Sequence, residues 1–176
     1  SGGGTMLCEP GRTITYSLYV PESLVEGITF RKSYALLDDW AVRAFVEMGI
    51  PASYREINDI ISPRGKIAGA AQARRRGLVL HHTTIAHAMD VELLPRLIRI
   101  GRPAIAGTGV RSADKSVSPL SWFTSLTCAE VARNLQRYFS NELRGHSSEV
   151  TPGELEAAGH LVSSKYGTPA WINRLP

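Results

Sequence analysis

Cysteine and aromatic residues are scarce in the sequence, and long apolar runs are absent. The two cysteines, Cys8 and Cys128, are too few for a disulfide framework, which favours a reducing cytoplasm. No run is long enough to span a bilayer, and the first residues, SGGGTMLCEPG, lack the basic and apolar regions of a secretory signal. Aromatic residues make up 7%, and no zinc-finger spacing or basic heptad region occurs. We therefore expect neither a membrane nor a nucleic acid as a partner.

The chain has the composition of one folded domain, because 43% of its 176 residues are hydrophobic and 20% are charged. We find no internal repeat and no linker-like tract, so 1–176 is treated as a single domain. The formal net charge is +4 and the pI is near 9.3. This basic balance favours acidic partners, such as an acidic protein domain or a phosphorylated small molecule.

Periodicity in the first half predicts strands around one helix. Alternating apolar residues predict a half-buried strand over 12–21, and the segments 54–61 and 77–86 are also predicted as strands. The sequence SPRG at 62–65 is predicted as a turn that leads to Lys66.

The predicted helices are clearer. Apolar spacing predicts a helix within 33–51, whereas Pro95 limits the next candidate to a short or broken helix. Two later helices are expected to begin at capping boxes, at Thr127 and at Thr151. Strands and helices do not alternate regularly, which predicts an α+β fold with mixed or antiparallel sheets packed against helices.

Two features near glycines could bind an anion. Gly2, Gly3 and Gly4 would let backbone N–H groups approach a ligand, although a frayed terminus is the commoner explanation. Lys66 in RGKIAG is either a solvated charge or an ammonium that faces a carboxylate or phosphate in a pocket.

The remaining polar candidates have ordinary explanations beside functional ones. Asn58 and Asp59 fit a strand end or a partner for a metal or hydroxyl group. His81 and His82 would face opposite sides of a strand, so one at most lines a given pocket. The arginines at 74–76 fit an exposed loop or a docking patch for an acidic partner.

Five segments in order carry a family resemblance. SGGGTMLCEPGRTITYSLYVP, NDI and GKIAGAAQARRRGLVLHHTTI are followed by KSVSPLSWFTSL and SSKYGTPAWIN. Together they resemble the lipoate–protein ligase family, whose superfamily also contains octanoyltransferases and biotin ligases. The resemblance extends over most of the chain and implies a biotin/lipoate ligase-like catalytic domain.

The resemblance implies roles for particular residues. The glycine-rich loop and strand start that would cradle an acyl-adenylate are Gly2, Gly3, Gly4, Thr5, Met6 and Leu7. Lys66 would be the catalytic residue that contacts the carboxyl group of the acid and the phosphate of the adenylate. Gly69 would permit close approach beside Lys66, and His82 would lie by the acyl pocket. Asn58 and Asp59 would help to hold magnesium or the nucleotide, and no metal ligand set is assigned.

The implied reaction is that of a lipoate–protein ligase with ATP and Mg²⁺. Lipoate or octanoate would be activated to an acyl-adenylate and transferred to a lysine of an acidic lipoyl carrier domain or of glycine-cleavage H protein. The family's arginine before the glycines and the elements that precede it are absent from the sequence. We therefore expect an N-terminally incomplete catalytic domain without an accessory C-terminal domain, whose N-terminal part is missing or on a separate polypeptide.

Two alternatives remain. An ATP-independent octanoyltransferase would take its acyl group from acyl carrier protein through a catalytic cysteine, which in the family precedes the N-D pair. The segment GIPASYREINDI contains no cysteine, which favours the ligase. The other alternative is a non-catalytic subunit of a split ligase.

Overall fold

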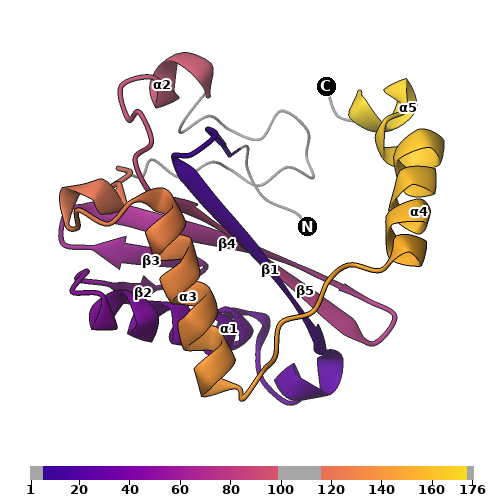
Figure 1. The fold of residues 1–176 in the computed structure, drawn as a ribbon, viewed down its shortest axis with the longest axis horizontal. Helices are drawn as coiled ribbons and strands as arrows, with labels where there is room; N and C mark the ends of the chain where they lie inside the picture. Colours follow the sequence, from indigo (N-terminus) through magenta and orange to yellow (C-terminus); the bar gives the residue numbers. More distant parts are fainter. Residues whose placement is uncertain (1–5, 99–115, 174–176) are drawn as a thin grey trace.

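The centre of the fold is one antiparallel sheet of five strands in the order β1-β5-β4-β3-β2 (Figure 1). The computed structural model describes residues 6–98 and 116–173. The strands are β1 (Thr13–Pro21), β2 (Ser53–Arg55), β3 (Asp59–Ser62), β4 (Gly65–Arg75) and β5 (Leu78–Ala86). The antiparallel sheet with its packed helices confirms the expected α+β class.

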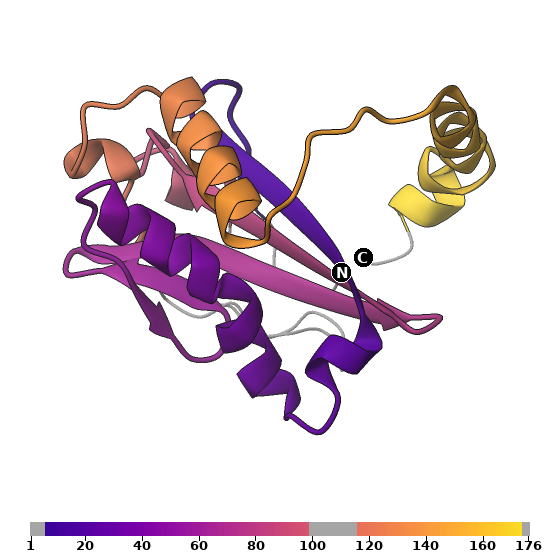
Figure 2. The ribbon, with the colours of Figure 1, turned by 60° about the horizontal axis from the view of Figure 1, so that its bottom comes forward.

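Two long helices cover the same face of the sheet (Figures 1 and 2). They are α1 (Phe30–Glu47) and α3 (Cys128–Glu142), and the core between them and the sheet includes Phe45, Ile85 and Leu135. The short elements are η1 (Glu22–Val25), α2 (Leu94–Leu97) and η2 (Leu120–Trp122). In the part of the chain that the structure describes, no helix has the length and apolarity that a membrane crossing requires.

The ends of the long helices follow from their sequences. The Thr29 side chain accepts a hydrogen bond from Lys32 N at the start of α1, and Gly49, with φ +77°, follows its end. At the start of α3, Thr127 and Glu130 form the predicted capping box. Both predicted helices are therefore confirmed.

The C-terminal helices form an arm that stands apart from the sheet in both views (Figures 1 and 2). The helix α4 (Pro152–Leu161) begins at the predicted capping box of Thr151 and continues through a π-helical turn, η3 (Val162–Tyr166), to α5 (Pro169–Ile172). None of these elements contains a buried residue. The apolar residues Leu155 and Leu161 of α4 are exposed.

Two predictions for the middle of the chain were wrong. The segment 54–61 is not one strand, because its chain turns back between β2 and β3, where Asn58 O accepts a hydrogen bond from Ala70 N. The arginines at 74–76 do not form one exposed loop, because Arg74 and Arg75 belong to β4, a continuous strand of 11 residues from Gly65 to Arg75. Its glycines do not interrupt pairing, because β3 and β5 bind it on both sides.

Candidate active site

The two faces of the sheet differ in character. On β4, the Gln72 side chain accepts a hydrogen bond from Ser33 Oγ of α1, so Gln72 faces the helices. Because side chains alternate along a strand, Gly69, Ala71 and Ala73 face the other way. We call this side of the sheet, away from α1 and α3, the distal face. These three residues form a row of small side chains along it.

The Lys66 ammonium lies at one end of this row. Nζ is 2.8 Å from Oδ1 of Asp59, whose side chain is 1% exposed, whereas that of Lys66 is 19% exposed. A Cβ atom on Gly69 would lie 2.3 Å from Nζ, so the ammonium occupies space that is open only because residue 69 has no side chain. The structure thus brings together Lys66, Asp59 and Gly69, three residues that the sequence singled out.

The backbone of Lys66 is held on both sides. Its N–H donates to Ser116 O at 2.8 Å, and its C=O accepts from Ser118 N at 2.7 Å, while Ile61 of β3 pairs with it across the other edge. A Cβ on Gly65 would lie 2.5 Å from Ser116 O, so only glycine allows this approach. The backbone from which the lysine side chain extends is therefore fixed in position.

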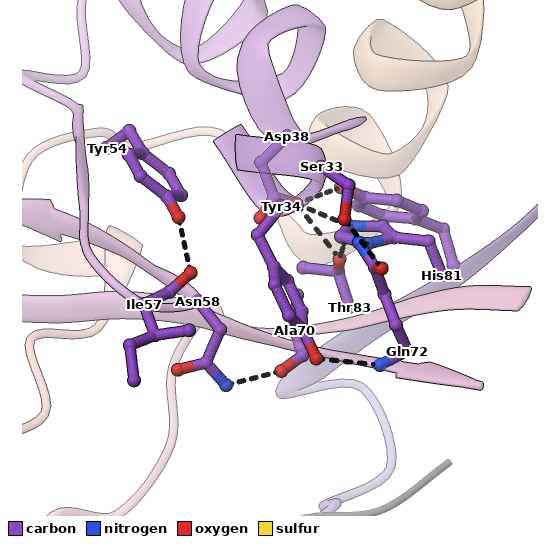
Figure 3. A network of polar contacts seen from close by, with 11 residues as sticks. Ser33, Tyr34, Asp38, Tyr54, Ile57, Asn58, Ala70, Gln72, His81 and Thr83 are labelled. Atoms are coloured by element: carbon purple, nitrogen blue, oxygen red, sulfur yellow. Dashed lines mark hydrogen bonds and ion pairs between the residues drawn. The ribbon is translucent and has the colours of Figure 1, made fainter. Parts of the chain in front are cut away.

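The side chain of Asn58 binds a backbone group. Its Nδ2 donates to Ala70 O at 2.6 Å, as Figure 3 shows. Nearby, the hydroxyl of Tyr54 donates to Ile57 O, and burial raises the pKa of Tyr54 to about 12. These bonds fix the turn that delivers Asp59 to β3. A contact of Asn58 with magnesium or a nucleotide stays a prediction.

His82 lies on the distal face and His81 on the helical face, which confirms the expected alternation. The strand register places His82 beside Ala71 of the small-residue row and beside Ser17 of β1. His82 Nδ1 is 2.8 Å from Ser17 Oγ, so the imidazole is oriented by β1. Thr84 pairs with Gly69 in the same register, one step nearer Lys66.

A buried polar network fills the helical face opposite this row (Figure 3). Oδ1 of Asp38 lies 2.8 Å from His81 Nε2 and accepts hydrogen bonds from Tyr16 and Thr83. Asp38 and His81 are both fully buried. Burial, with the Asp38 charge as a smaller cause, raises the pKa of Tyr16 well above its usual value.

Sequence reasoning missed this network. Asp38 was not singled out, although Tyr34, Leu37, Ala41 and Phe45 place it on the apolar stripe of α1. A carboxylate on such a stripe indicates a buried partner.

The arginine run divides into two parts and lies far from Lys66. Arg74 is half-buried: its Nη2 donates to Ser33 Oγ at 3.0 Å and its guanidinium lies over the Phe30 ring. Arg75 and Arg76 are exposed at the β4–β5 hairpin. Lys66 and Arg75 are the second and last residues of β4, separated by roughly 30 Å of strand. The run therefore does not flank Lys66.

The remaining candidates are only partly described. Gly2, Gly3, Gly4 and Thr5 lie outside the described residues, and Met6 and Leu7 approach β1 without a regular element. Among residues 6–98 and 116–173, no group of three or more His, Cys, Asp or Glu side chains could hold a metal ion.

The cysteines occupy different surroundings. Cys8 is exposed, whereas Cys128 is half-buried at the start of α3, and burial raises the pKa of its thiol. Its Sγ is 4.0 Å from Thr13 O. Since α3 covers the helical face, Cys128 and the Lys66 ammonium are on opposite sides of the sheet.

Chemically, the distal face combines the Lys66 ammonium, paired with Asp59, with a row of small side chains. An ammonium that is largely removed from water attracts a carboxylate or phosphate strongly. Beyond it, Gly69, Ala71 and Ala73 present only small side chains along β4. The arrangement suits a ligand with an anionic head and a linear apolar tail.

The chain resembles known proteins over most of its length. The family model for the lipoyl protein ligase A/B catalytic domain matches residues 1–140. The chain is 26% identical to octanoyltransferase LipM of Symbiobacterium thermophilum, with 92% of the chain and 68% of LipM covered. It is 25% identical to lipoate-protein ligase A subunit 1 of Thermoplasma acidophilum, with 78% of the chain and 57% of that protein covered.

A solved structure shares the fold. It describes an archaeal lipoylation system of Thermoplasma acidophilum, a bi-partite lipoate protein ligase and its E2 lipoyl domain. The TM-score is 0.72 at 23% identity, and the match covers 90% of the chain and 63% of that structure's chain. Across these three proteins, the chain spans 57% to 68% of the relatives' lengths.

Proposed function

The chain belongs to the lipoyl protein ligase A/B catalytic domain family, and on this premise we propose that it is a lipoate–protein ligase. It would activate lipoate or octanoate with ATP and transfer the acyl group to a lysine of an acidic carrier domain. The observation that carries the proposal is the Lys66 ammonium, which is held over Gly69 at the end of the small-residue row. The proposal keeps the cytoplasmic location expected from the low cysteine content.

The substrate acid would lie along β4 with its carboxylate at Lys66. From Gly69 to Ala73 the strand extends about 13 Å, which accommodates the extended chain of octanoate. His82 would then flank the chain near its middle, where it pairs with Ala71. Branched or bulky acids would meet the backbone of β4 and the side chains of β5.

Lys66 would act by stabilising charge. In the first step a carboxylate oxygen attacks the α-phosphorus of ATP and pyrophosphate leaves. The ammonium of Lys66 neutralises the carboxyl and phosphate oxygens as this bond forms. In the second step the uncharged amine of the carrier lysine attacks the acyl carbon, AMP leaves and the amine proton passes to solvent.

Further residues would support these steps. We assign the backbone N–H groups from Gly2 to Gly4 to the adenylate phosphate, with Thr5, Met6 and Leu7 beside the acyl group. Asp59 fits a place beside Mg²⁺, because this ion is commonly held by one or two carboxylates together with substrate phosphates. When bound, Mg²⁺ would supply neutralisation of phosphate charge. Asp59 also orients Lys66 through their ion pair.

The similarity to LipM favours a second candidate, an octanoyltransferase that takes its acyl group from acyl carrier protein. That reaction needs a thiolate that holds the acyl group as a thioester. Among the two cysteines, Cys128 is poorly suited, because its thiol pKa is raised and it lies across the sheet from Lys66. The exposed Cys8 is therefore the thiol that this candidate requires.

One experiment separates the two candidates. Acyl transfer to an apo lipoyl domain is measured with free octanoate, with and without ATP and Mg²⁺, and with octanoyl acyl carrier protein. The ligase predicts ATP-dependent transfer that survives the Cys8→Ser, Cys128→Ser double substitution. Lys66→Ala should lower adenylate formation by about 10²–10³, measured as pyrophosphate exchange.

The contrary results are equally clear. ATP-independent transfer from acyl carrier protein that is lost in the double mutant would replace the ligase by the transferase. Near wild-type exchange in Lys66→Ala would remove Lys66 from the site. Because one relative is named as a subunit and another as bi-partite, the assay is repeated with a complementing second polypeptide; activity only in its presence would assign the chain to a split ligase.

A further inference from the structure

An exposed arginine and an exposed tryptophan stack at the Lys66 end of the sheet. Cζ of Arg64, in the turn between β3 and β4, lies 4.1 Å from the ring centroid of Trp122 in η2. Trp122 is 41% exposed and Arg64 is also exposed. We propose that this pair, the Arg64–Trp122 ledge, is the docking surface for an acidic protein domain that presents the acceptor lysine. The inference rests on the proposed function and specifies where the carrier domain binds.

The ledge is held in place because the turn that carries Arg64 and the segment that carries Trp122 are joined by hydrogen bonds. The side chain of Ser62 lies 2.9 Å from Oγ of Ser118, and both residues are buried. Ser62 Oγ also accepts a hydrogen bond from Arg64 N at 3.1 Å. On the other side, Trp122 N donates to Pro119 O at 3.1 Å. A surface that is ordered before binding loses less entropy when a partner docks.

The hydrogen bonds of Ser118 also position the backbone of Lys66. Ser118, which contacts the turn, also donates its backbone N–H to Lys66 O. Arg64 precedes Lys66 by two residues, in the turn that leads into β4. A domain resting on the ledge would therefore lie next to the acyl carbonyl held at Lys66, within reach of a long lysine side chain.

The residue types fit an acidic partner. Tryptophan and arginine are among the residues that carry most of the binding energy in protein interfaces. The planar guanidinium binds carboxylates in a bidentate manner. Within residues 6–98 and 116–173, the ion pairs use Arg12, Arg31, Arg43, Lys66 and His81, but none uses Arg64. Among these residues, no carboxylate neutralises the charge of Arg64.

The alternative basic surface is less suitable. Arg75 and Arg76 lie at the hairpin, roughly 30 Å of strand from Lys66. A carrier that docked only there would hold its lysine far from the acyl carbonyl. The net charge of +4 would attract an acidic domain to the molecule as a whole, and the ledge would determine where it binds.

The test measures carrier binding separately from chemistry. The probe is a purified apo lipoyl domain, whose affinity is measured by isothermal titration with the full chain carrying Arg64→Ala, Trp122→Ala, or both. We expect each single substitution to weaken binding by about tenfold or more, and Arg64→Lys to recover only part of the loss. Adenylate formation, followed by pyrophosphate exchange without carrier, should stay near the wild-type rate.

Two control variants match the ledge in residue type. Arg76→Ala removes an exposed arginine at the other end of β4, and Tyr166→Ala removes an exposed ring that stacks with Lys165 in the C-terminal arm. Neither should change the affinity for the lipoyl domain beyond twofold. An unchanged pyrophosphate exchange rate in the ledge variants would also show that these variants fold.

Three outcomes would overturn the inference. Wild-type affinity in both ledge variants would remove the docking role and leave the proposed function intact. A raised KM for ATP or octanoate, with unchanged carrier affinity, would place the ledge in the small-molecule site. If the wild-type chain neither binds the lipoyl domain nor exchanges pyrophosphate, the proposed function fails and the inference fails with it.

Discussion

The Lys66 ammonium occupies the space that a side chain on Gly69 would fill. A Cβ there would lie 2.3 Å from Nζ and 2.6 Å from Cε. Gly69→Ala should therefore displace the ammonium while the strand remains paired, because the end of a lysine side chain can move. We expect adenylate formation to fall by about a hundredfold, since a shift of about 1 Å in a reacting group can have this effect.

The control for this substitution is Gly159→Ala in α4, where a Cβ meets no atom within 4 Å. It should leave activity unchanged and stabilise the chain slightly, as alanine is the better helix former. Pyrophosphate exchange and thermal unfolding are measured for both variants. A Gly69→Ala protein with the wild-type rate of pyrophosphate exchange would show that adenylate formation does not depend on the position of the Lys66 ammonium.

Asp38 and Asp39 offer neighbouring carboxylates in opposite environments. Asp38 is fully buried and accepts hydrogen bonds from Tyr16 and Thr83, whereas Asp39 is exposed and pairs with Arg43. Asp38→Ala should lower the free energy of unfolding by about 3–5 kcal/mol, because it leaves the buried His81 and its neighbours without their acceptor. Asp39→Ala should cost less than about 1 kcal/mol. Urea denaturation measures both, and equal effects would contradict the role of the network.

The arginines of the β4–β5 hairpin should respond differently to substitution. Arg74→Ala should destabilise the fold by about 1 kcal/mol, because it removes the bond to Ser33 and the contact with Phe30. Arg76 and Gly77 have φ values of +54° and +74°, a turn that favours Asn-Gly. Arg76→Asn should therefore raise the thermal midpoint, and a lowered midpoint would contradict this interpretation of the turn.

The two thiols should react at different rates. Burial raises the pKa of Cys128, so its thiolate fraction at a given pH is smaller than that of an unperturbed thiol. At pH 8 iodoacetamide should modify the exposed Cys8 first, and modification of Cys128 should accelerate as the pH rises. Peptide mass spectrometry follows each site, and urea should abolish the difference. Faster labelling of Cys128 in the native protein would be contrary to the structure.

Local signals in the sequence predicted the long elements well. The capping residues at Thr127 and Thr151 and the alternation in β1 depend on neighbouring residues, so they are visible without a structure. The sequence also singled out Lys66, Asp59 and Gly69 through the family resemblance, and the fold brings these three together.

Features that depend on distant pairing were missed. The turn at Asn58 is held by Ala70 across the sheet, and the extension of β4 to Arg75 depends on β5. Gly69 allows the close approach of Lys66 that the family resemblance implied, whereas the approach of Ser116 to Gly65 was not predicted. Local propensity carries no information on such contacts, so the sequence interpretation failed where tertiary contacts decide the backbone.

The adjacent histidines of β5 have a consequence for how the chain avoids misfolding. A slip of β5 by one residue would turn every one of its side chains to the opposite side of the sheet. His81 would then leave Asp38, and the buried carboxylate would lose its 2.8 Å contact. The imidazole at position 82 would turn into the core at the same time. In the slip that places Leu80, and not His82, at the position of His81, the buried carboxylate is left without an imidazole, so Asp38 penalises that misalignment.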